Sequence, residues 1–300
     1  MTEFGRHGCD VWKTGGCTLD PMTTPDPKLL EQIAGIVKTE GAVPEGVDPY
    51  AFCNEILPLL GSTDGKLREW RILGILHLWA VRREMSDEEL RTLLWTIADE
   101  DHLFLGIGED GTDTIYMRAF SVLVLVGFIR AHRDKAYLAA EELERLTETV
   151  IRYLDAEEDL RGFISDETLW GHATAHAADT FGELAQCKEL GAEALRAILD
   201  CLGRNVVTDR TVWHHEEDAR ATSAAIHALK REVLPKDEAA AWFDSLIPEA
   251  RFEGDLPGVH VRYVNARNIL RCLIHQGPAE GLPEDLIPLA EEAHGKLPER

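Results

Sequence analysis

Apolar residues recur at intervals of three and four along almost the whole chain beyond Pro27, and few stretches alternate in the way that half-buried strands do. This periodicity predicts an all-α fold. Helix starts are marked as well, because Ser86 and Glu89 make a capping-box pattern before Leu90–Ile97. We expect further helices over Pro27–Lys38, Pro49–Leu60, Lys66–Val81, Ile115–His132, Leu138–Leu154, Leu169–Leu190, Ala192–Leu202, Thr211–Leu229, Asp237–Leu246, Tyr263–Ile274 and Pro283–Ala293.

A succession of ordinary helices joined by short loops is typical of a HEAT-like α/α superhelix, which is built from antiparallel helix pairs. A compact irregular helical bundle is the alternative. We expect residues 25–300 to form a single α-helical repeat domain. Residues 1–24 are rich in Gly, Thr and Pro and show no periodicity, so we interpret them as a disordered extension or as an artefact of expression or of the assigned start.

The chain carries 54 acidic and 31 basic residues, which gives a formal net charge of −23. Such a surface repels phosphate backbones and acidic membranes, so we expect neither nucleic acid nor a membrane as a partner. The longest apolar run, Ala119–Ile129, is shorter than the roughly 20 residues that cross a bilayer, and it is interpreted as a buried core helix.

The start of the chain lacks the pattern of a secretory signal, and we expect a cytoplasmic protein. The six cysteines show no Cys-x-x-Cys pair. Four of them lie in helical apolar patterns, which is typical of reduced core thiols.

Polar groups of a particular kind follow one face of the expected helix after Trp170. At 3.6 residues per turn, His172, His176, Asp179 and Glu183 fall within an arc of about 60°. Two imidazoles one turn apart could bind a divalent metal such as Zn, Mn or Fe, with Asp179 or Glu183 as a third ligand. The other interpretation is a structural polar layer between packed helices, in which each histidine bonds a neighbouring group. No cofactor is therefore assigned.

A second cluster, His214 to Asp218 followed by Arg220, lies where another helix is expected to begin. Acidic residues in a first helical turn are explained by the helix dipole, but adjacent histidines are not. If this helix packs beside the first, His215 or Glu217 could complete a site with His172 and His176.

Several segments together carry a resemblance to one family. They are Leu60–Asp64, Leu67–Arg68, Thr112–Asp113, Arg118–Ser121, Asp159–Phe163, Trp170–Asp179, Glu217–Arg220, Asn265 and Arg267–Leu270. In this order they resemble the bacterial family called domain of unknown function 2785. The resemblance implies an all-helical, HEAT-like domain without an established activity. It also implies recurrent polar positions at Asp113, Arg118, Ser121, Arg161, His172, His176, Asp179, Glu217 and Arg220.

Two functions stay open at this point. The first is a helical-repeat binding or scaffold protein, in which a His/Asp/Arg network lines a groove for a peptide, a protein segment or a small anionic molecule. The second is a metal-assisted enzyme, for example a hydrolase, with His172, His176 and Asp179 at the metal. The residues expected to bind the ligand are Asp113, Arg118, Ser121, Arg161, Trp170, His215, Glu217 and Arg220.

Overall fold

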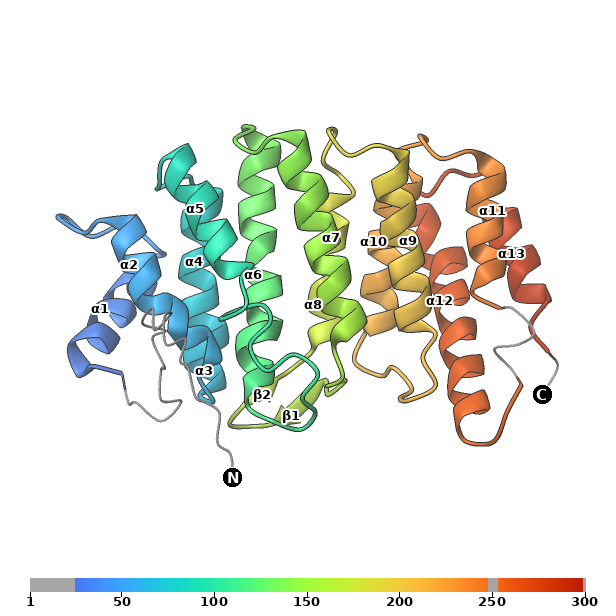
Figure 1. Cartoon of the computed structure of the whole chain (residues 1–300), viewed down its shortest axis with the longest axis horizontal. Coiled ribbons are helices and arrows are strands. Elements are labelled where there is room, and N and C mark those ends of the chain that lie inside the picture. Colours follow the sequence, from blue (N-terminus) through green and yellow to red (C-terminus); the bar gives the residue numbers. More distant parts are fainter. Residues whose placement is uncertain (1–24, 248–252, 299–300) are drawn as a thin grey trace, which may run out of the picture.

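In the computed structural model, which describes residues 25–247 and 253–298, helices follow one another along the chain and one small hairpin interrupts them (Figure 1). The α-helices are α1 (Pro27–Lys38), α2 (Pro49–Ile56), α3 (Gly65–Leu67), α4 (Gly74–Val81), α5 (Asp87–Ile97), α6 (Thr114–Asp134), α7 (Ala140–Ala156), α8 (Ala173–Leu184), α9 (Ala192–Val206), α10 (Glu217–Leu229), α11 (Lys236–Ser245), α12 (Gly258–Glu280) and α13 (Ile287–Gly295). The short 3₁₀ helix η1 (Leu57–Gly61) follows α2, and the π-helix η2 (Arg68–Leu73) leads into α4. Strands β1 (Phe163–Ser165) and β2 (Leu169–Trp170) pair in antiparallel fashion, with Phe163 opposite Trp170. The predicted all-α class is confirmed.

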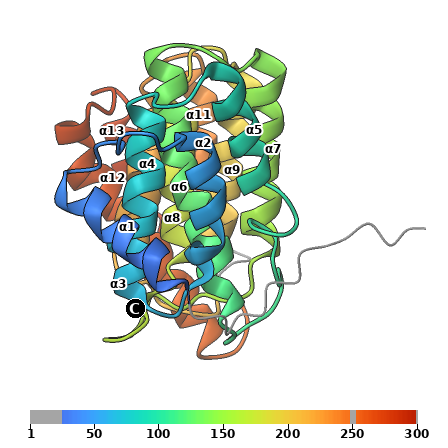
Figure 2. The same ribbon diagram turned by 90° about the vertical axis from the view of Figure 1, so that its left-hand side faces the viewer.

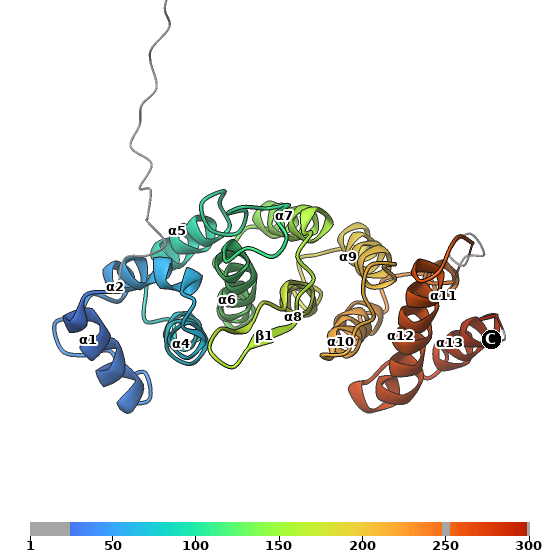
Figure 3. The ribbon, with the colours of Figure 1, turned by 90° about the horizontal axis from the view of Figure 1, so that it is seen from below.

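The helices form two layers in a curved row, which Figure 3 shows from one end of the helices and Figure 2 from the end of the row. Helices α4, α6, α8 and α10 lie on the inside of the curve, and each packs on the next. We call these four the inner layer. Helices α5, α7 and α9 cover its other side. The HEAT-like superhelix is a finer description than all-α and stays a prediction, as does the single repeat domain.

Helix α6 lies at the centre of the core. All residues from Ile115 to Ile129 are buried except Leu123, so the predicted burial of Ala119–Ile129 is confirmed. By length and composition, α6 is also the one helix of the described chain that could cross a membrane. However, 83% of its apolar window is buried inside the protein, as in a core helix.

Local sequence signals explain several helix ends. Ser86 and Glu89 form the predicted capping box, in which the Glu89 N–H donates to Ser86 Oγ at 3.3 Å and the Ser86 N–H donates to Glu89 Oε2 at 2.8 Å. Asp26 and Asp48 accept bonds from the first turns of α1 and α2. These short side chains satisfy backbone donors that a helix start leaves unpaired.

Three predicted helices begin at least four residues too early, because Leu169–Leu190, Thr211–Leu229 and Pro283–Ala293 correspond to helices that begin at Ala173, Glu217 and Ile287. The prediction of Leu169–Leu190 is wrong at both ends, because Leu169 and Trp170 form a strand and α8 ends at Leu184. Leu169 and His172 have φ angles of 56° and 60°, in the left-handed region that interrupts a helix. Helix α10 begins at Glu217, and Asn265 holds the loop before it by bonds to backbone groups of that loop.

The cysteines of the described chain are free thiols, as predicted. Cys53, Cys187 and Cys201 are buried, and burial raises the pKa of each of these thiols to about 12. Residues 1–24, with Cys9 and Cys17, lie outside the described residues, so the interpretation of this segment as a disordered extension or an artefact is not tested.

Candidate functional site

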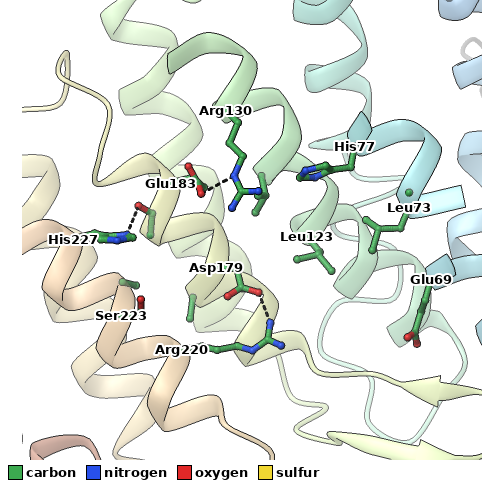
Figure 4. Close-up of a pocket in the computed structure, with 15 residues that line it drawn as sticks. Glu69, Leu73, His77, Leu123, Arg130, Asp179, Glu183, Arg220, Ser223 and His227 are labelled. Atoms are coloured by element: carbon green, nitrogen blue, oxygen red, sulfur yellow. Dashed lines mark hydrogen bonds and ion pairs between the residues drawn. The ribbon is translucent and has the colours of Figure 1, made fainter. Parts of the chain in front are cut away.

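A groove of about 490 Å³ runs across the inner layer (Figure 4). Each of its four walls is one face of a helix, because the lining residues of each helix are spaced by three or four. These residues include Glu69, Leu73 and His77 from η2 and α4, Leu123, Val126 and Arg130 from α6, Ala178, Asp179, Gly182 and Glu183 from α8, and Arg220, Ser223, Ala224 and His227 from α10.

Small residues set the distance between α8 and α10. A Cβ atom added to Gly182 would lie 3.4 Å from Nδ1 of His227 and 3.7 Å from Cα of Ala224. The two helices therefore approach closely, with the side chains of Asp179 and Arg220 meeting at the surface of the groove (Figure 4).

Ion pairs organise the floor of the groove. Arg220 donates to a carboxylate oxygen of Asp179, and Arg130 Nε donates to Glu183 Oε1 at 2.8 Å. Glu183 also accepts a bond from Arg133. Each of these two groove carboxylates is thus matched by at least one guanidinium group.

The environment of the groove alters the charge of its titratable groups. Burial raises the pKa of Asp179 above its ordinary value, although the neighbouring Arg220 acts in the opposite direction. Burial also lowers the pKa of His77 and His227, with positive charge on Arg130 and Lys230 adding to the respective effects. Both imidazoles are consequently neutral at pH 7.

The predicted polar stripe divides between two environments. Asp179 and Glu183 face the groove, as their shared helix face predicts. His172 does not belong to that face, because it precedes α8 with a left-handed backbone. Its Nε2 atom lies 2.9 Å from the carbonyl oxygen of His215 and 3.3 Å from Glu217 Oε1.

His176 lies in the interior between α8 and α6. Its Nδ1 atom lies 3.1 Å from the carbonyl oxygen of Ala119, and its ring meets the ring of Phe120 edge to face at 5.0 Å. Burial, followed by the neighbouring His172, lowers the pKa of His176 well below its ordinary value. His176 is therefore a neutral structural group, as the second interpretation of the stripe predicts.

The metal interpretation of His172, His176 and Asp179 is not supported by this geometry. Within residues 25–247 and 253–298, no group of three or more His, Cys, Asp and Glu side chains is arranged to hold a metal ion. The physical reason is that the predicted arc of 60° requires His172 to belong to the same helix as Asp179, whereas α8 begins only after His172. Asp179 instead pairs with Arg220.

The predicted contact between the two polar clusters is present, between the buried side chains of His172 and Glu217. Glu217 is buried and accepts the N–H of His215 at 2.9 Å in addition to its contact with His172. Burial acts to raise the pKa of Glu217, but the hydrogen bonds from His172 and from backbone N–H groups outweigh it and lower the pKa. The Trp170 ring stacks on His172 with 4.8 Å between centroids, which closes this junction.

Several of the other predicted ligand-binding residues are paired within the chain or buried. Arg118 is fully buried and forms a bidentate pair with Glu157, at 2.6 Å and 3.0 Å. Arg161 pairs with Asp159, and it also donates to a backbone carbonyl. Ser121 is buried, and its hydroxyl has no hydrogen-bond partner among the described residues.

Asp113 is exposed at the start of α6 and makes no side-chain capping bond. None of the predicted residues Asp113, Arg118, Ser121, Arg161, Trp170, His215 and Glu217 lines the groove, whereas Arg220 does.

Sequence reasoning missed most of the groove. The sequence patterns indicate none of Glu69, His77, Arg130 and His227 as a site residue. A signal existed for His77, which is a lone polar group in the apolar run from Ile75 to Trp79. The others lie on ordinary amphipathic helices, and only the packing of those helices brings them together.

The sequence comparisons agree with the resemblance carried by the motifs. Residues 103–274, more than half of the 300-residue chain, match the model of a family described as protein of unknown function (DUF2785). No curated protein and no solved structure matches the chain. The matched range contains α6, α8 and α10, and therefore three of the four walls of the groove.

Proposed function

The chain belongs to this family of proteins of unknown function, and we propose that it is a binding protein whose groove holds an acidic peptide segment. The observation that carries the proposal is the groove itself, whose arginine side chains offer more donors than the groove carboxylates take up. The proposal keeps the binding or scaffold role expected from the sequence, and it moves the site from the buried histidines to the inner face of the row.

The size and lining of the groove suit a peptide side chain with its flanking backbone. Small-ligand pockets measure about 300–1,000 Å³ and combine apolar surface with a few polar groups. Here Leu73, Leu123 and Val126 supply apolar surface, and Ser223 adds a hydroxyl. The groove crosses four helices in succession, so a ligand along it would contact every member of the inner layer.

The surplus of donors favours a ligand that carries acceptor oxygens, such as a carboxylate, while the third groove carboxylate, Glu69, is paired with Arg68. A guanidinium carries five N–H donors, but Arg130 gives one hydrogen bond to Glu183, and Arg220 gives one to Asp179. No other hydrogen bond from these two side chains is formed within the described part of the chain. The side chains of Arg130 and Arg220 are 50% and 36% exposed, so their remaining donors can reach a ligand carboxylate.

The metal-assisted enzyme is not carried forward as a second candidate. Its proposed ligands lie in separate environments, and no other grouping of suitable side chains in the described ranges favours it.

The proposal is tested by selecting random dodecapeptides displayed on phage against the full-length protein. We expect the enriched peptides to contain Asp or Glu, and isothermal titration with synthetic copies to show one site. The double variant Arg130→Gln/Arg220→Gln is expected to weaken binding at least about tenfold, since a charged hydrogen bond contributes about 1.5–3 kcal/mol.

Arg152→Gln is the matched control, because Arg152 pairs with Glu100 on the surface away from the groove. This variant is expected to bind like the wild type. The proposal is wrong if no acidic peptide is enriched, or if the enriched peptides bind the double variant as tightly as they bind the wild type.

A further inference from the structure

A cluster of four basic side chains lies near the carboxyl end of the row, apart from the groove. Arg267, Arg271 and His275 follow one another at intervals of four on α12, so they lie within an arc of about 80° on that helix. His294 comes from α13, which packs against α12 (Figure 3). We call these four residues the α12–α13 cluster.

The cluster has no acidic partner. The side chains of its four members form no hydrogen bond and no ion pair within residues 25–247 and 253–298. Arg267 lies over the face of the Tyr263 ring, with its Cζ atom 5.6 Å from the centroid. In a chain with a net charge of −23, most other described arginines pair with a carboxylate or a backbone carbonyl, so this arrangement is unusual.

Two donors in the cluster are both buried and unsatisfied. Nε of Arg267 and Nε2 of His294 are shielded from solvent and have no hydrogen-bond partner. Buried polar atoms are normally paired, so these two nitrogens have unused capacity for a hydrogen bond with a group from outside the chain. The two atoms come from different helices, so such a partner would lie at the contact between α12 and α13.

The electrostatics of His294 show how the four groups act on one another. Burial lowers the pKa of His294, and Arg271, Arg267 and His275 all lower it further. The end of a helix such as α13 normally favours a positive charge. The three neighbouring basic groups disfavour a proton on His294 in spite of this, and no carboxylate of the described chain forms an ion pair with the cluster.

We propose that the α12–α13 cluster is a binding site for a phosphate-type dianion. Two guanidinium groups match the charge of a phosphate group, and their planar forks together with two imidazole N–H groups provide donors for its several oxygens. A single carboxylate has one charge and two oxygens, so it would leave part of the cluster unpaired. A bound dianion would offset the like charges of Arg267 and Arg271 and contact the exposed side chains of Arg271 and His275 directly, whereas the two buried nitrogens would reach it only after their side chains turn toward it.

The site is tested with the full-length protein by following the imidazole signals of His275 and His294 in NMR spectra during titration with inorganic phosphate. Ionic strength is held constant with chloride. We expect saturable shifts of both imidazoles and a dissociation constant at least about tenfold weaker in Arg267→Gln/Arg271→Gln. Arg271→Gln alone, at an exposed position, serves as the variant least able to disturb folding, and it is expected to weaken binding as well.

Two controls separate this site from the rest of the molecule. Arg196→Gln removes an exposed pair with Glu238 and is expected to leave phosphate binding unchanged. Arg130→Gln/Arg220→Gln is also expected to bind phosphate normally, so the two proposals can fail independently. Phosphoserine binding more tightly than phosphate assigns the site to a phosphate carried on a larger molecule, and weaker binding assigns it to free phosphate. The absence of saturable shifts, or equal affinity in the cluster variants, would overturn the proposal.

Discussion

Replacing Glu157 with Gln is expected to lower the free energy of unfolding by about 3–5 kcal/mol, because it leaves the Arg118 guanidinium charged, buried and unpaired. Both side chains of this pair are 0% exposed. The Arg118 group would keep its bonds to Thr114 Oγ1 at 2.7 Å and to the carbonyl oxygen of Glu109 at 2.9 Å, but these two oxygens are uncharged. The Glu109 carboxylate acts on Arg118 electrostatically, but its hydrogen bonds go to Thr112 and Thr114. At about 2–4 °C per kcal/mol, the melting temperature should fall by about 6–20 °C.

The assay is urea unfolding followed by circular dichroism and by tryptophan fluorescence, with free energies compared where the two transitions coincide. The double variant Arg118→Met/Glu157→Gln should lose less free energy of unfolding than the sum of its two single variants, because each single change leaves one buried charge unpaired and the double change leaves none. Arg152→Gln, in a pair that is 59% and 73% exposed, should change stability by less than about 1 kcal/mol. A loss below about 1 kcal/mol for Glu157→Gln, or strict additivity, would refute the reasoning.

Three further predictions concern the core. The pKa of His176 is well below the ordinary value of 6.5, so the unfolded chain binds a proton there that the folded chain does not, and stability falls as the pH drops below about 6.5. His176→Gln should therefore reduce the slope of the free energy of unfolding against pH by up to about 1.4 kcal/mol per pH unit, measured by urea unfolding at pH 5.5 and 6.5. An unchanged slope would contradict this prediction. Gly162→Ala should lower the melting temperature, because the new Cβ would lie 2.2 Å from His215 Nδ1. Adding His215→Ala should restore part of the lost melting temperature, and no restoration would contradict the proposed clash. Trp79→Phe should cost about 1–3 kcal/mol in the same unfolding assay, since it removes the bond of 2.7 Å from Nε1 to the carbonyl oxygen of Gly41, and a neutral effect would show that this carbonyl finds another donor.

The helices could largely be predicted from the sequence, because local signals determine them. The bounds of α1, the capping box at Ser86 and the burial of Ala119–Ile129 all follow from short-range patterns. The start of α8 could not be predicted in this way. It depends on the left-handed backbone of His172, which is held by a contact with a loop about 40 residues later.

The site shows the same limit more strongly. The shared face of Asp179 and Glu183 follows from helical periodicity, and both line the groove. The partners Arg130 and Arg220 come from the helices on either side, and the order of helices within a layer is set by tertiary packing. Arg118 shows the opposite limit. It is predicted to bind a ligand because it is charged, but its side chain is fully buried against Glu157.

One wall of the groove comes from a different part of the chain than the other three. Helices α6, α8 and α10 lie within the range that matches the family, while η2 and α4 precede it. Arg130 and Arg220, which would bind the ligand, belong to the matched range with their paired carboxylates. The facing wall of Glu69, Leu73 and His77 does not. A chimera that exchanges residues 27–97 with those of another family member would therefore keep the arginine pairs and replace the wall that faces them. Ligand preference could then change while the capacity to bind a ligand is retained.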